Sequence, residues 1–218
     1  MTGLKRLADG ERVLWGVGTA RAIRAHWALH ELGLDYRIEA VRTRTGDTET
    51  DVFTRLNPRQ KIPVLCDGGI TLSESAAIVT YLAERYGNSD TLYMPGDVEQ
   101  RARHNEWLSF ICMELDATSL YVLRRHQYLP EIYGDSPVVN NAARAYFTRM
   151  ITSAVPLMND ERPFLLGDRF SGVDILMSTC LQWAQNYDLA LPEIFSAYLE
   201  RMLARPAFSL AQAANTPP

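Results

Sequence analysis

Cysteine is scarce in this sequence of 218 residues, and its three cysteines are widely separated. Cys66, Cys112 and Cys180 form no CxxC pair, so their spacing indicates neither a disulfide framework nor a zinc knuckle. An odd set of scattered cysteines is typical of proteins from a reducing compartment. We therefore expect a protein without structural disulfides and without a metal held by cysteine.

Long apolar segments and an excess of positive charge are lacking as well. The beginning of the sequence, MTGLKRLADGER, has no apolar run of signal-peptide length, and no stretch is long enough to span a membrane. The formal net charge of -4 argues against a nucleic-acid partner. Hydrophobic and charged contents of 47% and 22% are those of ordinary globular proteins. We expect a cytoplasmic protein with neither a membrane nor a nucleic acid as its partner.

The first part of the sequence alternates strand and helix patterns. Residues 12–17 (RVLWGV) form a short apolar run that predicts a strand. Helical periodicity begins at Thr19 and ends near Gly33, a good C-cap. Residues 36–41 alternate like a second strand, and residues 51–56 predict one or two helical turns.

Residues 57–87 (NPRQKIPVLCDGGITLSESAAIVTYLAERYG) predict a hairpin followed by a helix. Pro63 lies inside the first apolar run of the hairpin, where proline removes a ladder donor. Ser73-Glu74-Ser75 brings two hydroxyls and a carboxylate to the helix start, where free backbone N–H groups bind anions. The order strand-helix-strand, then hairpin-helix, predicts an α/β domain of the thioredoxin type.

The second part lacks strand signals. Residues 88–96 form a polar connector punctuated by proline and glycine, and long helical patterns follow over 98–128 and 138–158. Residues 171–174 match a variant capping box, and Pro192 opens a further helix that ends before Arg205-Pro206. The second part is therefore predicted to be an all-helical bundle. The predicted organisation is an N-terminal α/β domain, a linker and an all-α domain, at residues 1–87, 88–97 and 98–218.

Two stretches carry a family resemblance. Lys61-Ile62-Pro63-Val64-Leu65 and Glu74-Ser75-Ala76-Ala77-Ile78 resemble the glutathione-binding half of the cytosolic glutathione transferases. The pieces GDRFSGVDI and LPEIFSAYLERMLARPAF resemble the C-terminal domain of the same family. The resemblance implies the GST fold, a cis bond before Pro63, and a homodimer to which Tyr81, Arg85 and the first long helix contribute.

The resemblance also implies a glutathione site. Ile62 would pair its backbone with the cysteinyl part of glutathione, while Glu74 and Ser75 would hold the γ-glutamyl amine and carboxylate. Lys61 would reach the glycyl carboxylate, with a solvent-facing lysine as the alternative, and Gln60 would contribute beside it. The predicted glutathione-binding residues are Gln60, Lys61, Ile62, Pro63, Glu74 and Ser75.

The chemistry of glutathione needs a thiolate. A free thiol with a pKa near ~8.5 is only a few per cent ionised at neutral pH, and lowering that pKa by about 2 units requires roughly 2.7 kcal/mol. A hydroxyl donor and a helix N-terminus together supply such stabilisation. Family members carry Tyr, Ser or Cys in the strand-to-helix turn, where this sequence has Gly18-Thr19-Ala20-Arg21. Thr19 is our candidate donor and Arg21 a candidate source of positive charge.

Each of these residues has a second interpretation. The Thr19 hydroxyl also suits a helix cap, either instead of catalysis or in addition to it. Arg21 equally suits a solvated first-turn arginine. No cysteine lies in the turn, which argues against mixed-disulfide chemistry. His26 and His30 have the i, i+4 spacing of a metal pair, but no third ligand is near, so we expect a helix surface and no metal.

A pocket for the second substrate would lie between the domains, against the first long helix. Trp107, Phe110 and Met113 are its candidate lining, with core packing as the alternative.

The predicted function is that of a glutathione transferase: the protein binds reduced glutathione as co-substrate, stabilises its thiolate, and conjugates it to a small electrophile or uses it to reduce a peroxide. Isomerisation or dehalogenation would use the same residues. The alternative from another class is a non-enzymatic interaction module of the same fold, as in the stringent starvation protein and elongation-factor gamma subunits. The threonine in the turn leaves that alternative open, whereas Pro63 and Glu74-Ser75 weigh against it.

Overall fold

The computed structural model describes residues 10–158 and 162–218. The first nine residues, which bear on the expectation that no signal peptide is present, lie outside the described residues. The chain forms two compact units, Met1–Met94 with Ala204–Pro218, and Pro95–Leu203. We call them the first and second unit. Residues 204–218 pack with the α/β part, whereas the boundaries predicted from the sequence assigned them to the helical domain.

A four-stranded sheet in the order β2-β1-β3-β4 forms the centre of the first unit. β2 runs parallel to β1, and β3 is antiparallel to both β1 and β4. The apolar runs that predicted the strands place Leu14 of β1 opposite Leu65 of β3, which in turn faces Leu72 of β4. The strands are β1 (Arg12–Trp15), β2 (Arg37–Glu39), β3 (Val64–Asp67) and β4 (Ile70–Ser73).

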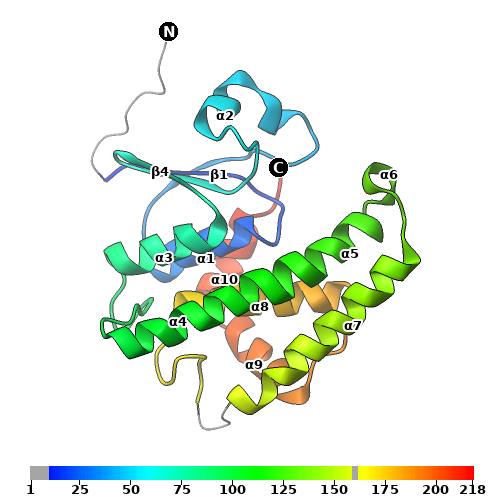
Figure 1. The fold of residues 1–218 in the computed structure, drawn as a ribbon. Helices are drawn as coiled ribbons and strands as arrows, with labels where there is room; N and C mark the ends of the chain where they lie inside the picture. Colours follow the sequence, from blue (N-terminus) through cyan, green and yellow to red (C-terminus); the bar gives the residue numbers. More distant parts are fainter. Residues whose placement is uncertain (1–9, 159–161) are drawn as a thin grey trace. The chain divides into compact units, whose positions relative to one another are not determined.

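Helices cover the sheet on both sides. Helices α1 (Ala22–Glu31) and α3 (Ser75–Tyr86) lie together on one side, and α2 (Asp51–Leu56), preceded by the single turn η1 (Asp47–Glu49), lies on the other (Figure 1). This arrangement is the predicted thioredoxin-like α/β domain. Sequence analysis placed the start of the first helix at Thr19, three residues before the regular helix begins.

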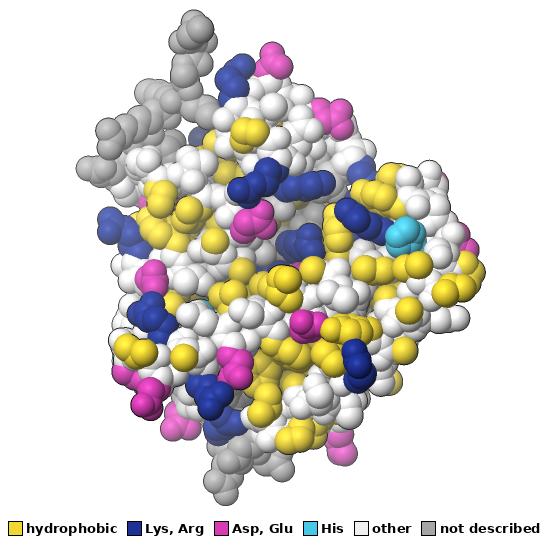
Figure 2. Space-filling model, viewed as in Figure 1, with side chains coloured by type: hydrophobic (Ala, Val, Ile, Leu, Met, Phe, Trp, Pro, Cys, Tyr) yellow, Lys and Arg dark blue, Asp and Glu magenta, His cyan; other side chains and the backbone are white. Residues whose placement is uncertain are grey.

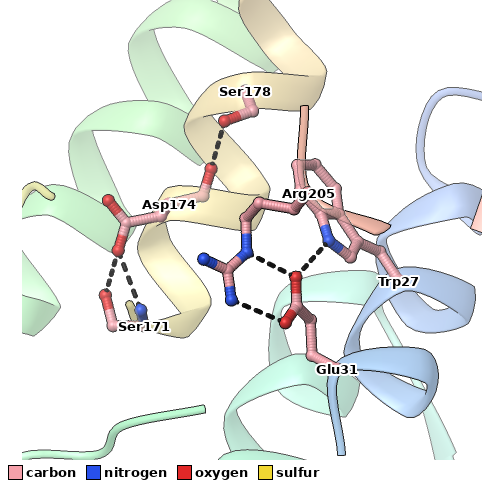
Figure 3. Close-up of polar contacts among 6 residues, drawn as sticks. All are labelled: Trp27, Glu31, Ser171, Asp174, Ser178 and Arg205. Carbon is pink, nitrogen blue, oxygen red and sulfur yellow. Dashed lines mark hydrogen bonds and ion pairs between the residues drawn. The ribbon is translucent and has the colours of Figure 1, made fainter. Parts of the chain in front are cut away.

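Helix α10 (Pro206–Ala214) completes the first unit by packing on α1. The Arg205 guanidinium, just before α10, donates two hydrogen bonds to Glu31, over 2.6 and 2.7 Å. The Trp27 indole donates to the same carboxylate over 2.8 Å (Figure 3), and the rings of Trp27 and Phe208 lie 4.8 Å apart. Sequence analysis took Arg205-Pro206 as a helix stop and missed α10, because proline both ends one helix and begins the next.

The second unit is helical, as predicted. Its first long helix is continuous from α4 through η2 to α5, and η2 is a π-helical stretch that the sequence did not indicate. In η2 the hydroxyls of Thr118 and Ser119 donate to carbonyls five residues back, which suits the wider π turn. The predicted helix over 138–158 ends at Ser153, before Pro156. The elements are α4 (Val98–Phe110), η2 (Ile111–Leu120), α5 (Tyr121–His126), α6 (Pro130–Tyr133), α7 (Pro137–Ser153), η3 (Val155–Leu157), α8 (Gly172–Asn186) and α9 (Glu193–Leu203).

The predicted capping box organises the buried helix α8. Asp174, which has no exposed surface, accepts hydrogen bonds from the Ser171 N–H and hydroxyl over 2.9 and 2.6 Å (Figure 3). It also accepts from the Leu165 N–H and the Tyr198 hydroxyl, each over 2.8 Å. Burial raises the pKa of this carboxyl, and the four donors oppose the rise. Asp174 therefore joins three segments of the second unit, which is the folding role expected of it.

The surface carries side chains of both charges. On the face shown in Figure 2, acidic and basic side chains are interspersed among apolar ones. None of the helices in the described ranges is long and apolar enough to cross a membrane.

Candidate functional site

Thr19 forms the turn between β1 and α1. Its hydroxyl oxygen accepts a hydrogen bond from the Ala22 N–H over 2.9 Å, and its carbonyl accepts from the Ile23 N–H over 3.2 Å. Thr19 therefore caps α1, one of its two predicted roles. Because the hydroxyl uses a lone pair in this bond, its proton stays available to a second acceptor. Arg21, the residue before α1, is half-buried.

Ile62 lies beside this turn, before β3. The Ile62–Pro63 peptide bond is cis, as the resemblance implied. The Ile62 side chain packs against Gly16 so closely that a Cβ on Gly16 would lie 2.6 Å from the Ile62 Cβ. Gly16 also has a φ of +124°, so the position requires glycine for two reasons. Within the described backbone, Ile62 makes no hydrogen bond to another main-chain group.

The start of α3 carries a buried positive charge. Arg24 of α1 is 1% exposed, and its guanidinium donates to the Ser75 hydroxyl over 3.3 Å. Ser75 is the first residue of α3, where the helix presents unpaired N–H groups. A buried guanidinium and a helix N-terminus both favour an anion, so this corner of the first unit suits a carboxylate.

Glu74, the residue before α3, has a strained backbone. Its φ of 72° lies in a region that non-glycine residues rarely adopt. Its exposed carboxylate pairs with Arg59 over 3.0 Å, and the same guanidinium donates to the Ser73 hydroxyl over 3.1 Å. An ion pair this exposed contributes little stability, so it does not by itself explain the strain.

The loop before β3 is strained in the same way. Gln60 has a φ of 53°, and its side-chain amide donates to the Thr54 hydroxyl over 3.1 Å. Lys61 is exposed, and its carbonyl accepts from the Asn57 side-chain amide over 2.8 Å. Gln60 and Glu74 are two of the four non-glycine residues with positive φ among those described, and both belong to the predicted glutathione site. Such strain concentrates at functional sites.

The expected position of His26 on a helix surface is wrong. His26 has no exposed surface and contacts the Gly16 carbonyl through Nε2 and the Tyr36 hydroxyl through Nδ1, over 3.0 and 2.8 Å. The same hydroxyl contacts His30 Nε2 over 3.1 Å. The i, i+4 spacing therefore marks a partly buried hydrogen-bonded chain, His26–Tyr36–His30. Among residues 10–158 and 162–218, no group of three or more His, Cys, Asp or Glu is placed to hold a metal.

The candidate lining of the second-substrate pocket lies in the second unit. Trp107 of α4 is 7% exposed and packs edge-on against Phe110, with ring centroids 5.9 Å apart. Met113 of η2 is 61% exposed. Core packing accounts for Trp107 without a ligand, whereas Met113 is largely exposed to solvent. Tyr81, expected in a dimer contact, donates its hydroxyl to Asp67 over 3.0 Å.

Sequence reasoning missed three residues of this site: Arg24 behind Ser75, Arg59 beside Glu74, and Asn215, which contacts Thr19. Arg59 lies only 15 positions before its partner Glu74, and the opposite charges of the two side chains were the signal that could have indicated their ion pair. Arg24 lies 51 positions from its partner Ser75, and Asn215 lies 196 positions from its partner Thr19, so no local sequence pattern indicates these contacts.

Two family models match the chain. The model described as "Glutathione S-transferase, N-terminal domain" matches residues 12–84, and "Glutathione S-transferase, C-terminal domain" matches residues 128–206. The first match contains the candidate glutathione site, apart from Asn215.

Individual proteins agree with these matches. Glutathione S-transferase 2 of Anopheles gambiae is 35% identical over 142 residues, which are 64% of this chain and 63% of that protein. The chain thus spans less than two thirds of that relative's length. The solved structure of a glutathione transferase from Methylococcus capsulatus is 29% identical, with a TM-score of 0.76 and coverage of 94% of this chain and 98% of that one. A theta class glutathione S-transferase of Xanthomonas axonopodis pv. citri, solved with glutathione bound, is 26% identical, with a TM-score of 0.75 and coverage of 91% and 95%.

Proposed function

This chain belongs to the glutathione S-transferase family, and we propose that it binds reduced glutathione in its first unit and stabilises the glutathione thiolate. The thiolate is then transferred to a small electrophile. A homodimer, a cytoplasmic location and a role in detoxification belong to the same proposal, on the strength of family membership alone.

The observation that carries the proposal is the buried pair of Arg24 and Ser75 at the start of α3. A guanidinium that is 1% exposed places positive charge at this corner, and the first N–H groups of α3 add to that positive potential. The γ-glutamyl end of glutathione supplies a carboxylate, which suits both. Its amine suits the carboxylate of Glu74, which is held at the same corner by a strained backbone.

Ile62 supplies the second anchor. Glutathione is a peptide, and its cysteinyl part offers one N–H and one carbonyl, the complement of the main-chain groups that Ile62 leaves open. Pairing there aligns the cysteinyl residue along the sheet, as an added strand would. Gln60 and Lys61 precede this anchor, so the glycyl carboxylate would extend toward the exposed Lys61 ammonium.

Thr19 is the proposed thiolate donor. Its hydroxyl accepts from the Ala22 N–H, which polarises the O–H bond, and its proton then donates to the glutathione sulfur. Arg21 and the N-terminus of α1 add positive potential at the same place. The thiol loses its proton to solvent, and the sulfur lone pair forms the S–C bond as the leaving group departs with its electron pair.

The use of peroxides is the other branch of the proposal. The thiolate would attack one peroxide oxygen, break the O–O bond and release an alcohol or water, which leaves glutathione sulfenic acid. The thiol of a second glutathione would then displace the hydroxyl group as water and form the disulfide. Trp107, Phe110 and Met113 remain the proposed apolar residues for the second substrate.

Calorimetric titration with reduced glutathione tests the binding step. We expect micromolar to low-millimolar affinity in the wild type and about 10- to 150-fold weaker binding in Ser75→Ala, since one hydrogen bond to a charged group contributes roughly 1.5–3 kcal/mol. Ser153→Ala, at an exposed serine of the second unit, is the control and should bind normally. No heat with the wild type, together with an unshifted melting point in excess glutathione, would favour the interaction module instead.

Ultraviolet absorbance of the thiolate against pH tests the chemical step. In Thr19→Val the pKa of bound glutathione should rise by about 1–2 units, which corresponds to roughly 1.4–2.7 kcal/mol of lost stabilisation. Thr19→Ser keeps the hydroxyl and should retain the wild-type pKa. An unchanged titration in Thr19→Val would reduce Thr19 to a helix cap.

A further inference from the structure

Asn215, the residue that follows α10, makes hydrogen bonds to the turn that carries Thr19. The Gly18 N–H lies 2.7 Å from the main-chain oxygen of Asn215 and 3.0 Å from its side-chain oxygen. The Asn215 side-chain amide in turn donates to the Thr19 carbonyl over 3.3 Å. Asn215 thus bonds to the donor of one turn residue and the acceptor of the next.

Asn215 reaches the turn on a helix that is anchored separately. Arg205, before α10, makes the two hydrogen bonds to Glu31 at the far end of α1, and Phe208 packs on Trp27. α10 therefore runs along α1 and ends beside its beginning. The position of Asn215 is set by contacts about three helical turns away from Thr19.

Pro217, two residues after Asn215, also packs closely against the turn. A Cβ added to Gly18 would lie 2.8 Å from the Cγ of Pro217, and Gly18 has a φ of +78°. Close packing and a left-handed backbone both require glycine here. The segment after α10 and the turn are therefore fitted to each other.

We propose that Asn215 is a positioning residue for the Thr19 hydroxyl. The direction of that hydroxyl follows from the Thr19 backbone, whose carbonyl oxygen accepts from both the Ile23 N–H of α1 and the Asn215 side-chain amide. A hydrogen bond to a thiolate is strongly directional, so a turn that is free to rotate would stabilise the thiolate less well. This inference rests on the proposed glutathione chemistry, but it assigns a role to a segment outside the glutathione site.

The test is the pKa of bound glutathione in Asn215→Ala, measured by thiolate absorbance. We expect an increase of about one unit, a tenfold lower thiolate fraction at a pH below the pKa. The affinity for S-methylglutathione, which has no thiol to ionise, should change less than about twofold because Ile62, Glu74 and Ser75 keep their positions. Ser209→Ala, at an exposed residue of the same helix, is the matched control for both measurements.

Asn215→Asp provides a second variant if the alanine substitution disturbs folding. Aspartate keeps an acceptor for the Gly18 N–H but cannot donate to the Thr19 carbonyl, and its negative charge disfavours a nearby thiolate, so the pKa should rise at least as much as in the alanine variant. Asn215→Ala removes the side-chain acceptor of the Gly18 N–H and keeps the main-chain one, so hydrogen exchange of this amide, followed by NMR, should become moderately faster; it should stay slow in Ser209→Ala.

The outcomes separate the two proposals. A lowered pKa in the wild type that Asn215→Ala leaves unchanged, while Thr19→Val raises it, overturns the role of Asn215 alone. Parallel losses of S-methylglutathione affinity and thiolate would mean that Asn215 only supports the fold, which also overturns it. No glutathione binding by the wild type overturns the proposed function and this inference together.

Discussion

The buried His26 makes the stability of the first unit sensitive to acid. The Gly16 carbonyl can only accept a hydrogen bond, so His26 Nε2 carries its proton. In the neutral ring Nδ1 is then bare and accepts from the Tyr36 hydroxyl, whose oxygen accepts in turn from His30 Nε2. A second proton on His26 would leave Nδ1–H without this acceptor unless Tyr36 turned away from it.

The magnitude follows from the pKa. Burial lowers the pKa of His26 from 6.5 to about 4, with a small contribution from His30, although the hydrogen bond to Gly16 opposes the shift. Below about pH 6.5 His26 is protonated in the unfolded chain, whereas in the folded chain it stays neutral until about pH 4. The free energy of unfolding therefore falls as the pH is lowered through this window. The loss is about 2 kcal/mol by pH ~5 and about 3 kcal/mol below pH ~4. Burial lowers the pKa of His30 too, which acts in the same direction.

The assay compares urea unfolding of the wild type and His26→Gln at about pH 7 and about pH 5. Glutamine places an amide near the position of Nε2, so it can still donate to Gly16, but it does not titrate. The variant should be less stable at neutral pH because it loses the bond to Tyr36. Its further loss on acidification should be smaller than that of the wild type by about 2 kcal/mol. An equal loss in both proteins would refute the reasoning, because the acid sensitivity would then come from other groups.

Two further substitutions test the fold and the site. Asp174→Ala removes the shared acceptor of four buried hydrogen bonds and should lower the unfolding free energy by about 3–5 kcal/mol in chemical denaturation. Its glutathione affinity should be unchanged. A loss under about 1 kcal/mol would contradict the role of Asp174 in joining three segments of the second unit. Gly16→Ala should destabilise by more than about 2 kcal/mol and weaken glutathione binding, because its Cβ would collide with Ile62. Gly46→Ala, with positive φ but open space around it, measures the strain without the collision.

Much of the fold follows from local patterns. The apolar runs near 12–17 and 62–72 predicted three of the strands because period and turn signals act within a few residues. The capping box at Ser171 and Asp174 was recognisable because a helix start has its own chemistry. Helix α10 was not recognisable, because a proline can end one helix or begin the next. The π turns of η2 were not recognisable either, because they produce no hydrophobic period that differs from that of an α-helix.

The candidate site divides along the same line. The sequence by itself determined that Pro63, Glu74 and Ser75 stand in a hairpin-helix segment that resembles a glutathione site, and that Thr19 lies in a strand-to-helix turn, since each of these features depends on neighbours in the chain. Only the tertiary structure decided that Arg24 lies buried behind Ser75, and that Asn215, 196 positions along the chain, holds the backbone of Thr19. Those contacts arise from the packing of α1 against α3 and α10. The positions of these helices along the sequence do not indicate which of their side chains come into contact.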